Sequence, residues 1–182
     1  MNIFVTHSSP EQSAFWHCDK HVVKQITETL QMLACAAIRH NIPTDILPLT
    51  KAGTPVKGGY HKHPCSLWAG DNRSNFYWLT RLGLALSTEY TARYGKTHFC
   101  QKGIEQMKSC IEYIPEGILT PFAVAINQEQ TCRQKVENFD SLPVPIQYRL
   151  YIKHDKPFAK WKFNRPEWVD WSDQEIVEDS RF

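Results

Sequence analysis

The chain has 182 residues, 42% of them hydrophobic and 12% aromatic, which is typical of a folded globular protein and excludes a disordered chain. The formal net charge of +2 is too small to indicate nucleic-acid binding by itself. No apolar run approaches the roughly 20 residues of a membrane-spanning helix, and the six cysteines contain no CxxC pair, so we expect neither a membrane partner nor a zinc site built from paired cysteines.

The first ten residues, MNIFVTHSSP, lack the basic region and apolar run of a secretion signal, so we expect a cytoplasmic protein with free thiols. Residues 2–6 form a short β-type run, expected either as a strand or as an extended segment packed on the core. A helix should start at Ser9, because serine is a favoured N-cap, Pro10 suits the first helical position and Gln12 completes a capping-box pattern.

The stretch HCDKHVVKQITETLQMLACAA, residues 17–37, is the strongest helix signal, and at 100° per residue it has two faces. One face is apolar and consists of Val22, Val23, Ile26, Leu30, Leu33 and Ala37. The other face is polar and consists of His17, Lys20, His21, Lys24, Glu28 and Gln31. This polar face is either solvated or part of a site, and its histidines, whose charge changes near neutral pH, favour a site. Pro43 predicts that the helix ends between residues 39 and 41.

Residues 41–62 are rich in Pro and Gly and should form a long loop, alone or with a weak hairpin, closed by an HKH run that we interpret as a polar loop end. Asp71 is the expected cap of a second long helix that runs to about Tyr94, with Gly95 as its C-cap glycine. Cations are favourable at a helix C-terminus, so the basic groups gathered here suit either simple helix-end chemistry or phosphate binding. These groups are Arg93, Lys96 and His98.

A third helix is expected over residues 97–114, where Pro115 stops it, and a short fourth helix over 146–154. In the following segment, KPFAKWKFNRPEW, basic residues alternate with aromatic ones, a pattern that suits phosphates and bases. Equally, the aromatic rings could pack into the core of the protein while the lysine ammonium groups remain exposed to solvent. The residues of this segment expected to bind substrate are Lys160, Lys162, Arg165 and Trp168. The acidic end, residues 170–182, is expected to be a solvated tail.

Several of these stretches together resemble one family. Asp19-Lys20-His21 followed by Glu28 resembles the start of the catalytic helix of the phage pyrimidine-dimer DNA glycosylases, the endonuclease V family. The NIFVT run lies at about the family's distance upstream, WLTRLGLALSTEYTARYG is similar to its long second helix, and RPEW is similar to its closing Arg-Pro-x-Trp segment. The chain also resembles small tailed-phage proteins that open with MNIFV and carry an HCDKH helix, which indicates a phage origin and the host-cell cytoplasm.

The resemblance implies a reaction in which an amine attacks the sugar C1′ and displaces the base, while a carboxylate assists ring opening and elimination. Glu28 matches the catalytic glutamate. The family's nucleophile is the α-amine exposed when the initiator Met is removed; because Asn2 is bulky, we expect Met1 to be retained and its own amine to serve. An α-amine has a pKa of about 7.7–8.0, so a useful fraction is unprotonated at neutral pH. Where the family carries arginines beside the glutamate, this chain has Thr27 and Gln31.

We therefore predict a mainly α protein, with a single compact helical domain over residues 1–169, three long helices, one short helix, a long loop at about 41–62, and an acidic tail over 170–182. The predicted function is that of a glycosylase/lyase acting on nucleic acid or a nucleotide. If the substrate is a duplex, its target base would have to be flipped out of the helix. No metal or cofactor is expected. Besides the catalytic Glu28 and Met1, the residues expected to contact substrate or phosphate are His17, Lys20, His21, Lys24, Arg93, Lys96, His98, Lys160, Lys162, Arg165 and Trp168.

Three alternatives stay open. A hydrolase with the same fold could cleave a small signalling nucleotide, which the missing arginines and the modest net charge favour. A metal-dependent nuclease could use His17, His21 and Glu28, because histidines four residues apart on a helix can share a metal. The third alternative is a non-catalytic binding protein, for example one that blocks a host factor.

Overall fold

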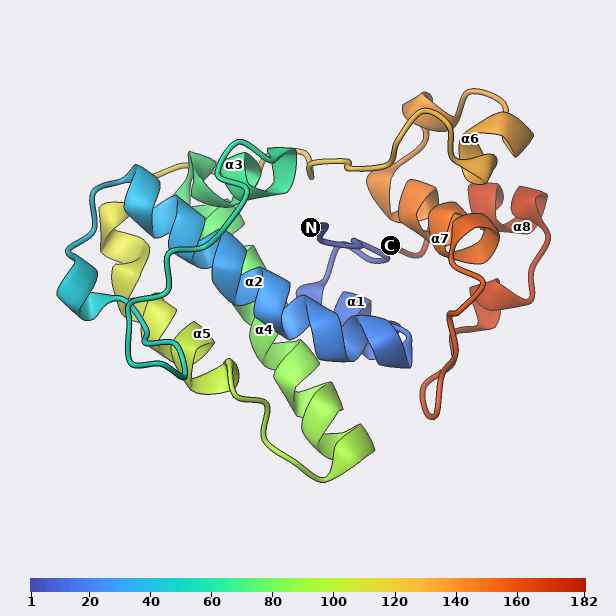
Figure 1. Cartoon of the computed structure of the whole chain (residues 1–182). Coiled ribbons are helices and arrows are strands. Elements are labelled where there is room, and N and C mark those ends of the chain that lie inside the picture. Colours follow the sequence, from blue (N-terminus) through green and yellow to red (C-terminus); the bar gives the residue numbers. More distant parts are fainter.

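The computed structural model describes residues 1–182 and contains helices but no strand (Figure 1). The predicted mainly α fold class is confirmed. The α-helices are α1 (Pro10–Phe15), α2 (Asp19–Arg39), α3 (Pro64–Asp71), α4 (Arg73–Tyr94), α5 (Gln101–Met107), α6 (Thr131–Lys135), α7 (Val144–Asp155) and α8 (Asp173–Glu178). Four 3-10 helices accompany them: η1 (Thr44–Ile46), η2 (Lys108–Tyr113), η3 (Phe139–Ser141) and η4 (Glu167–Val169). None of the helices is both long and apolar enough to cross a membrane.

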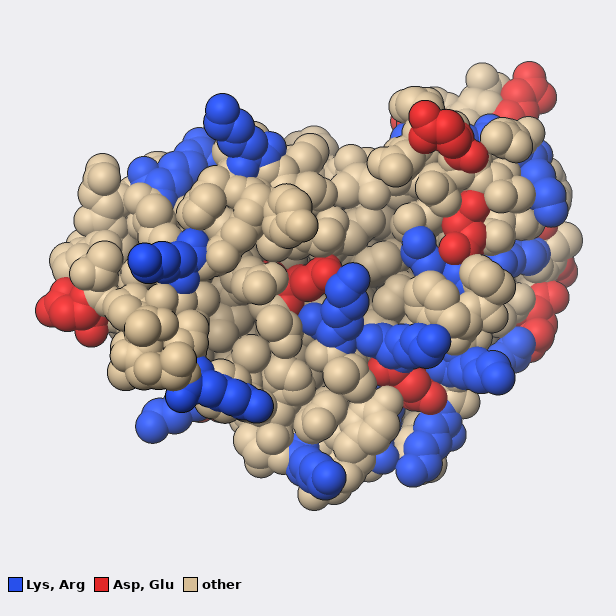
Figure 2. Space-filling model, in the orientation of Figure 1, with Lys and Arg blue, Asp and Glu red and all other residues tan.

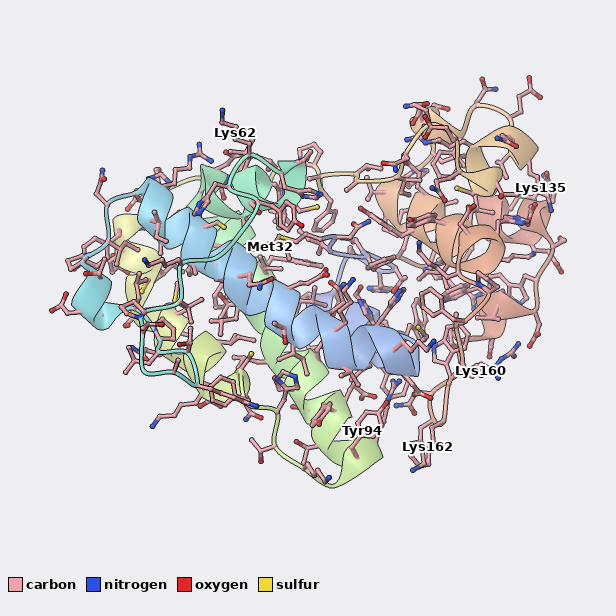
Figure 3. All side chains as sticks on the ribbon, in the orientation of Figure 1. Met32, Lys62, Tyr94, Lys135, Lys160 and Lys162 are labelled. Atoms are coloured by element: carbon pink, nitrogen blue, oxygen red, sulfur yellow. The ribbon has the colours of Figure 1, made fainter.

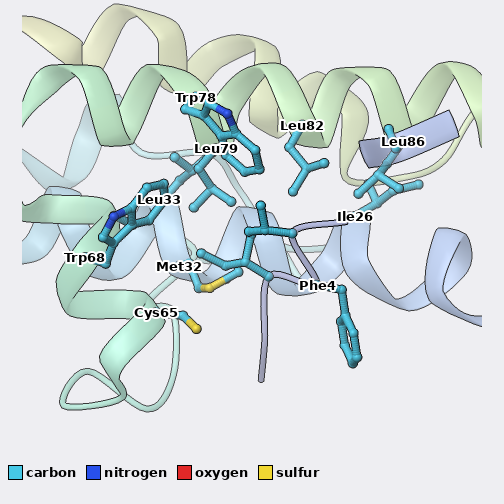
Figure 4. Packing of buried hydrophobic residues seen from close by; sticks show 14 of the residues in the cluster. Phe4, Ile26, Met32, Leu33, Cys65, Trp68, Trp78, Leu79, Leu82 and Leu86 are labelled. Carbon is cyan, nitrogen blue, oxygen red and sulfur yellow. The ribbon is translucent and has the colours of Figure 1, made fainter. Parts of the chain in front are cut away.

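The two longest helices, α2 and α4, pack along each other, with α1, α3 and α5 around them, while α6, α7 and α8 form a second group (Figure 1). Buried side chains such as Ile26, Leu33, Leu79 and Leu82 fill the space between α2 and α4 (Figure 4). Gly83 allows this close approach, because a Cβ there would lie 2.6 Å from Cγ2 of Thr29. The N-terminal segment runs between the two groups of helices (Figure 1).

The local start and stop signals of the sequence hold in the structure. Ser9 caps α1 and accepts a hydrogen bond from the Gln12 amide, although His7 rather than Gln12 accepts from the Ser9 amide. Helix α2 ends at Arg39 as predicted, and Gly95 ends α4 with a φ of 66°. In each case the signal lies within a few residues of the boundary it predicts.

Two helix starts differ from the sequence prediction, and the loop at 41–62 has some local structure. Asp71 ends the short helix α3, which the sequence did not suggest, and Asn72 caps α4 in its place. The third helix begins at Gln101 rather than near Thr97, and it tightens to 3-10 geometry from Lys108 onward. The loop at 41–62 carries η1 and one isolated antiparallel bridge, between Leu49 and Pro55, where a weak hairpin was considered.

The acidic end is a packed helix rather than a solvated tail. Ser172 and Glu175 form a reciprocal capping box at the start of α8, and Ile176 is fully buried. Asp179 accepts a hydrogen bond of 2.6 Å from the buried guanidinium of Arg149. A buried arginine requires a counter-charge, and the acidic end of the chain supplies it.

Candidate active site around Glu28

Glu28 lies on the side of α2 that faces the N-terminal segment, and only 7% of the residue is exposed. Its Oε2 accepts hydrogen bonds from the backbone nitrogen of Asn2 at 3.1 Å and from Nε2 of Gln25 at 2.8 Å. Its Oε1 lies 3.2 Å from the ammonium nitrogen of Lys24. These three donors compensate the carboxylate for its loss of water.

Asn2 holds the start of the chain against Glu28. Its side-chain amide donates to the carbonyl of Ala125 at 2.9 Å, and its Oδ1 accepts from the Tyr148 hydroxyl at 2.5 Å. Ile3 and the residues that follow it enter the core, so the predicted β-type run is an extended segment packed on the core. The backbone nitrogen of residue 2 is thereby fixed beside the Glu28 carboxylate.

Glu28 borders a cavity of about 390 Å³, a size within the usual range of small-molecule sites. Parts of the chain that are distant in sequence line it, and Figure 2 shows basic side chains gathered around this depression between the two groups of helices. Glu28 is the only carboxylate in the lining, against three lysines, so the cavity favours an anionic ligand. The lining residues are Met1, Asn2, Phe4, Lys20, His21, Lys24, Gln25, Glu28, Ala125, Asn127, Tyr151, Lys156 and Phe158.

His17 and His21 are buried, with 0% and 4% exposed. Desolvation by burial lowers the pKa of His17 to about 4 and that of His21 to about 3, so both rings are neutral at neutral pH. His17 precedes α2 and donates from Nδ1 to the Ser13 carbonyl at 2.6 Å, whereas His21 lines the cavity beneath the Phe4 ring. The histidines and Glu28 of the expected polar face are therefore buried, whereas Lys20 and Lys24 are exposed, and neither histidine supplies a cation for a phosphate.

Arg93 was expected to contact substrate, but in the structure its side chain connects neighbouring helices. The residue is 3% exposed, and all five of its guanidinium N–H donors have protein acceptors. Two of these donors bond Glu89, one bonds Asp19, and two bond the backbone carbonyls of Phe15 and His17. Arg93 therefore fixes the junction of α1, α2 and α4 and leaves no donor for a ligand.

The basic groups at the end of α4 lie away from the Glu28 cavity. Lys96 is exposed, and His98 lines a separate cavity of about 340 Å³ together with Thr27 and Gln31. Desolvation lowers the pKa of His98, and its ring packs edge-on against Tyr90 at 5.0 Å. The structure thus does not bring these two residues together with Glu28.

The C-terminal basic-aromatic segment contains both solvent-exposed and buried residues. Lys160 and Lys162 are exposed on the loop beside the N-terminal end of α2 (Figure 3), but neither lines the cavity. Arg165 forms a two-pronged ion pair with Asp170. Trp168 is 1% exposed and belongs to the core, so it offers no free face for a base.

Sequence reasoning missed several lining residues. Gln25 lies three residues before Glu28, a helix neighbour that the spacing could have shown. Lys156 and Phe158 belong to the basic-aromatic segment, but nothing local distinguishes them from the lysines and rings that point elsewhere. Of the predicted site residues, the structure brings together Met1, Lys20, His21, Lys24 and Glu28.

The arrangement also bears on the metal-dependent alternative. No group of three or more His, Cys, Asp or Glu side chains is placed to hold a metal ion. His17, His21 and Glu28, the set named for a nuclease, therefore do not form a metal site in this structure.

A family model described as pyrimidine dimer DNA glycosylase matches residues 1–102. The match covers more than half of the chain and includes the N-terminal segment, α2 and α4. No curated protein matches the chain, and no solved structure does.

Proposed function

This chain belongs to the pyrimidine dimer DNA glycosylase family, and on that premise we propose that it cleaves an N-glycosidic bond in nucleic acid by amine and carboxylate chemistry. Glu28 is the acid/base group, and an α-amine at the start of the chain is the nucleophile. Lys20 contacts the phosphate of the substrate, and Lys24 holds the Glu28 carboxylate through its ion pair. The family membership supports the reaction class, and the geometry around Glu28 supports the roles of its residues.

The observation that carries the proposal is the 3.1 Å contact between the backbone nitrogen of residue 2 and Glu28. This contact places the start of the chain beside a buried carboxylate that borders the cavity. The amine attacks C1′, the C1′–base bond breaks, and the base leaves with the electron pair. Glu28 takes up the proton that the amine loses on attack, delivers it to the ring oxygen as the sugar opens to the imine, and then accepts the C2′ proton when the imine eliminates the 3′ phosphate.

Two residues can carry this amine. In a chain that starts at Met1, the amine is that of Met1, which lines the cavity and whose sulfur accepts a hydrogen bond from Ser66 at 3.4 Å. In a chain that has lost Met1, the nitrogen now 3.1 Å from Glu28 becomes the α-amine of Asn2.

Borohydride trapping on abasic, damaged and plain oligonucleotides tests the proposal. We expect a covalent adduct that peptide mapping places on the first residue of the chain, and we expect an added N-terminal residue to abolish it without changing the melting temperature. An adduct on Lys20 or Lys24 would remove the N-terminal assignment and keep the imine chemistry. The absence of any adduct on an abasic strand would overturn the amine mechanism.

A second candidate function is hydrolysis of a small nucleotide by the same fold. It is favoured by Thr27 and Gln31, because the exposed side of α2 beside Glu28 offers no arginine to hold duplex phosphates. Turnover of free nucleotides by a protein without affinity for duplex DNA would decide for this candidate. A protein that binds its partner equally well after Glu28→Gln, and turns over nothing, would instead be a non-catalytic binding protein.

A further inference from the structure

The wall of the Glu28 cavity opposite α2 comes from the part of the chain that the family model does not match. Tyr151, Lys156 and Phe158 supply it, at and just after the end of α7. We propose that this wall selects the substrate, so that the cavity takes one nucleotide with an unpaired base. Lys20 and Lys156 hold its phosphate, and the Phe158 ring holds its base. The inference rests on the proposed function of the same cavity.

The lysines carry the first step. Among the three lysines of the lining, only Lys24 forms an ion pair, with Glu28. Lys156 donates to the Tyr151 hydroxyl at 2.7 Å and lies 4.1 Å from the centre of that ring, and Lys20 lies 5.0 Å from the centre of the Phe158 ring. Two ammonium groups without a carboxylate partner thus flank an aromatic surface, which suits a phosphate attached to a base.

The aromatic surface carries the second step. Phe158 is 37% exposed although it lines a cavity, and the neutral His21 ring supports it edge-to-face at 5.6 Å. The Tyr151 ring is stacked nearly parallel to Phe4 at 6.0 Å and is therefore held in place. With the Tyr151 ring fixed and the Phe158 ring accessible, the wall can stack on any of the nucleic-acid bases.

Enclosure carries the third step. Glu28 is 7% exposed at the edge of a cavity of about 390 Å³, with α2 on one side and the Tyr151–Phe158 wall on the other. A base that remains paired and stacked in a duplex keeps its C1′ atom outside such a space, so the nucleotide must enter unpaired. The uncharged Thr27 and Gln31 beside Glu28 leave little to hold the phosphates of an intact duplex.

Binding measurements with the Glu28→Gln protein test the inference without turnover. The probes are thymidine 5′-monophosphate, a single-stranded oligothymidylate, the same strand in a full duplex, and a duplex with one bulged thymidine. We expect the single strand and the bulge to bind more tightly than the full duplex. The mononucleotide shows whether the natural ligand is a free nucleotide or part of a strand. Affinity for the mononucleotide equal to the affinity per site for the single strand indicates a free nucleotide, and weaker affinity for the mononucleotide indicates a strand.

Variants of the wall give the residue-level test. We expect Phe158→Ala to weaken binding of the single strand about 5- to 150-fold, the range for one aromatic ring stacked on a base. Lys156→Met should lower the slope of log affinity against log salt by about 0.7 for a single strand. The matched controls are Phe163→Ala, an exposed ring of the same loop outside the cavity, and Lys135→Met on α6 (Figure 3); both should bind as the parent protein does.

Phe158→Leu keeps an apolar side chain against His21 but removes the ring, so it separates stacking from packing. Weaker binding by Phe158→Leu at an unchanged melting temperature supports the inference. Full-duplex binding as tight as single-strand binding, or unchanged affinity in both Phe158→Leu and Lys156→Met, overturns it. These results do not depend on catalysis, whereas the proposed function fails on trapping, so the two failures are distinguishable.

Discussion

Replacing Arg93 by methionine should destabilise the fold rather than weaken substrate binding. The side chain is 1% exposed, and its five hydrogen bonds join Glu89, Asp19 and two backbone carbonyls. Removing one partner of a buried ion pair typically costs about 3–5 kcal/mol, because the remaining charges lose their partner. For a domain of this size the cost corresponds to a fall in melting temperature of roughly 6–20 °C. The free-energy cost of about 3–5 kcal/mol is a large share of the roughly 5–15 kcal/mol by which folded domains are usually stable.

Urea denaturation and calorimetry of Arg93→Met, with Arg81→Met as the control, measure this effect. Arg81 forms a two-pronged pair with Glu11 at 2.8 Å, but both side chains are about half exposed, so its loss should cost less than about 1 kcal/mol. Arg93→Lys should recover only part of the stability, since lysine keeps the charge but lacks the planar fork. A normal melt for Arg93→Met together with weaker substrate binding would refute the structural role and restore Arg93 as a phosphate ligand.

Three further outcomes follow from buried groups. Trp168→Ala should cost about 3–5 kcal/mol of unfolding free energy in urea, and unchanged stability with weaker DNA binding would instead make Trp168 a stacking residue. The pKa values of His17 and His21 are lowered from about 6.5 to about 4 and about 3, so below about pH 6.5 the unfolded chain takes up protons that the folded protein does not. Stability should therefore be level above pH 6.5 and fall toward pH 4 by up to about 1.4 kcal/mol per pH unit for each histidine; a flat series of urea midpoints would contradict this. Asp179→Asn should cost about 3–5 kcal/mol by leaving Arg149 buried without its counter-charge, and a melt equal to that of the parent protein would contradict this role of Asp179.

The sequence could predict what short-range signals determine. Ser9 and Gly95 mark helix ends through their own backbone preferences, and the spacing of Val22, Ile26 and Leu33 sets the buried side of α2. Glu28 could be located as well, because a helix fixes its position relative to Lys24. These features need no knowledge of what packs against the helix.

What the sequence could not show is which residues are covered by distant parts of the chain. His21 is buried because Phe4 and Phe158 lie against it, and Val23, expected on the apolar face, is 41% exposed because no element covers it. Lys156 reaches the cavity only because α7 lies beside the N-terminal segment. No periodicity within α2 encodes these long-range contacts.

The central claim is that the Glu28 carboxylate performs catalysis, and the most direct measurement is the single-turnover rate of strand cleavage at an abasic site by Glu28→Gln. The substitution keeps an oxygen that can accept from the Asn2 amide, so binding and melting temperature should remain close to those of the parent protein. Because glutamine can neither accept nor deliver the proton, the rate should fall by about 10²–10⁴-fold. A rate equal to that of the parent protein, with intact folding and binding, would contradict the claim.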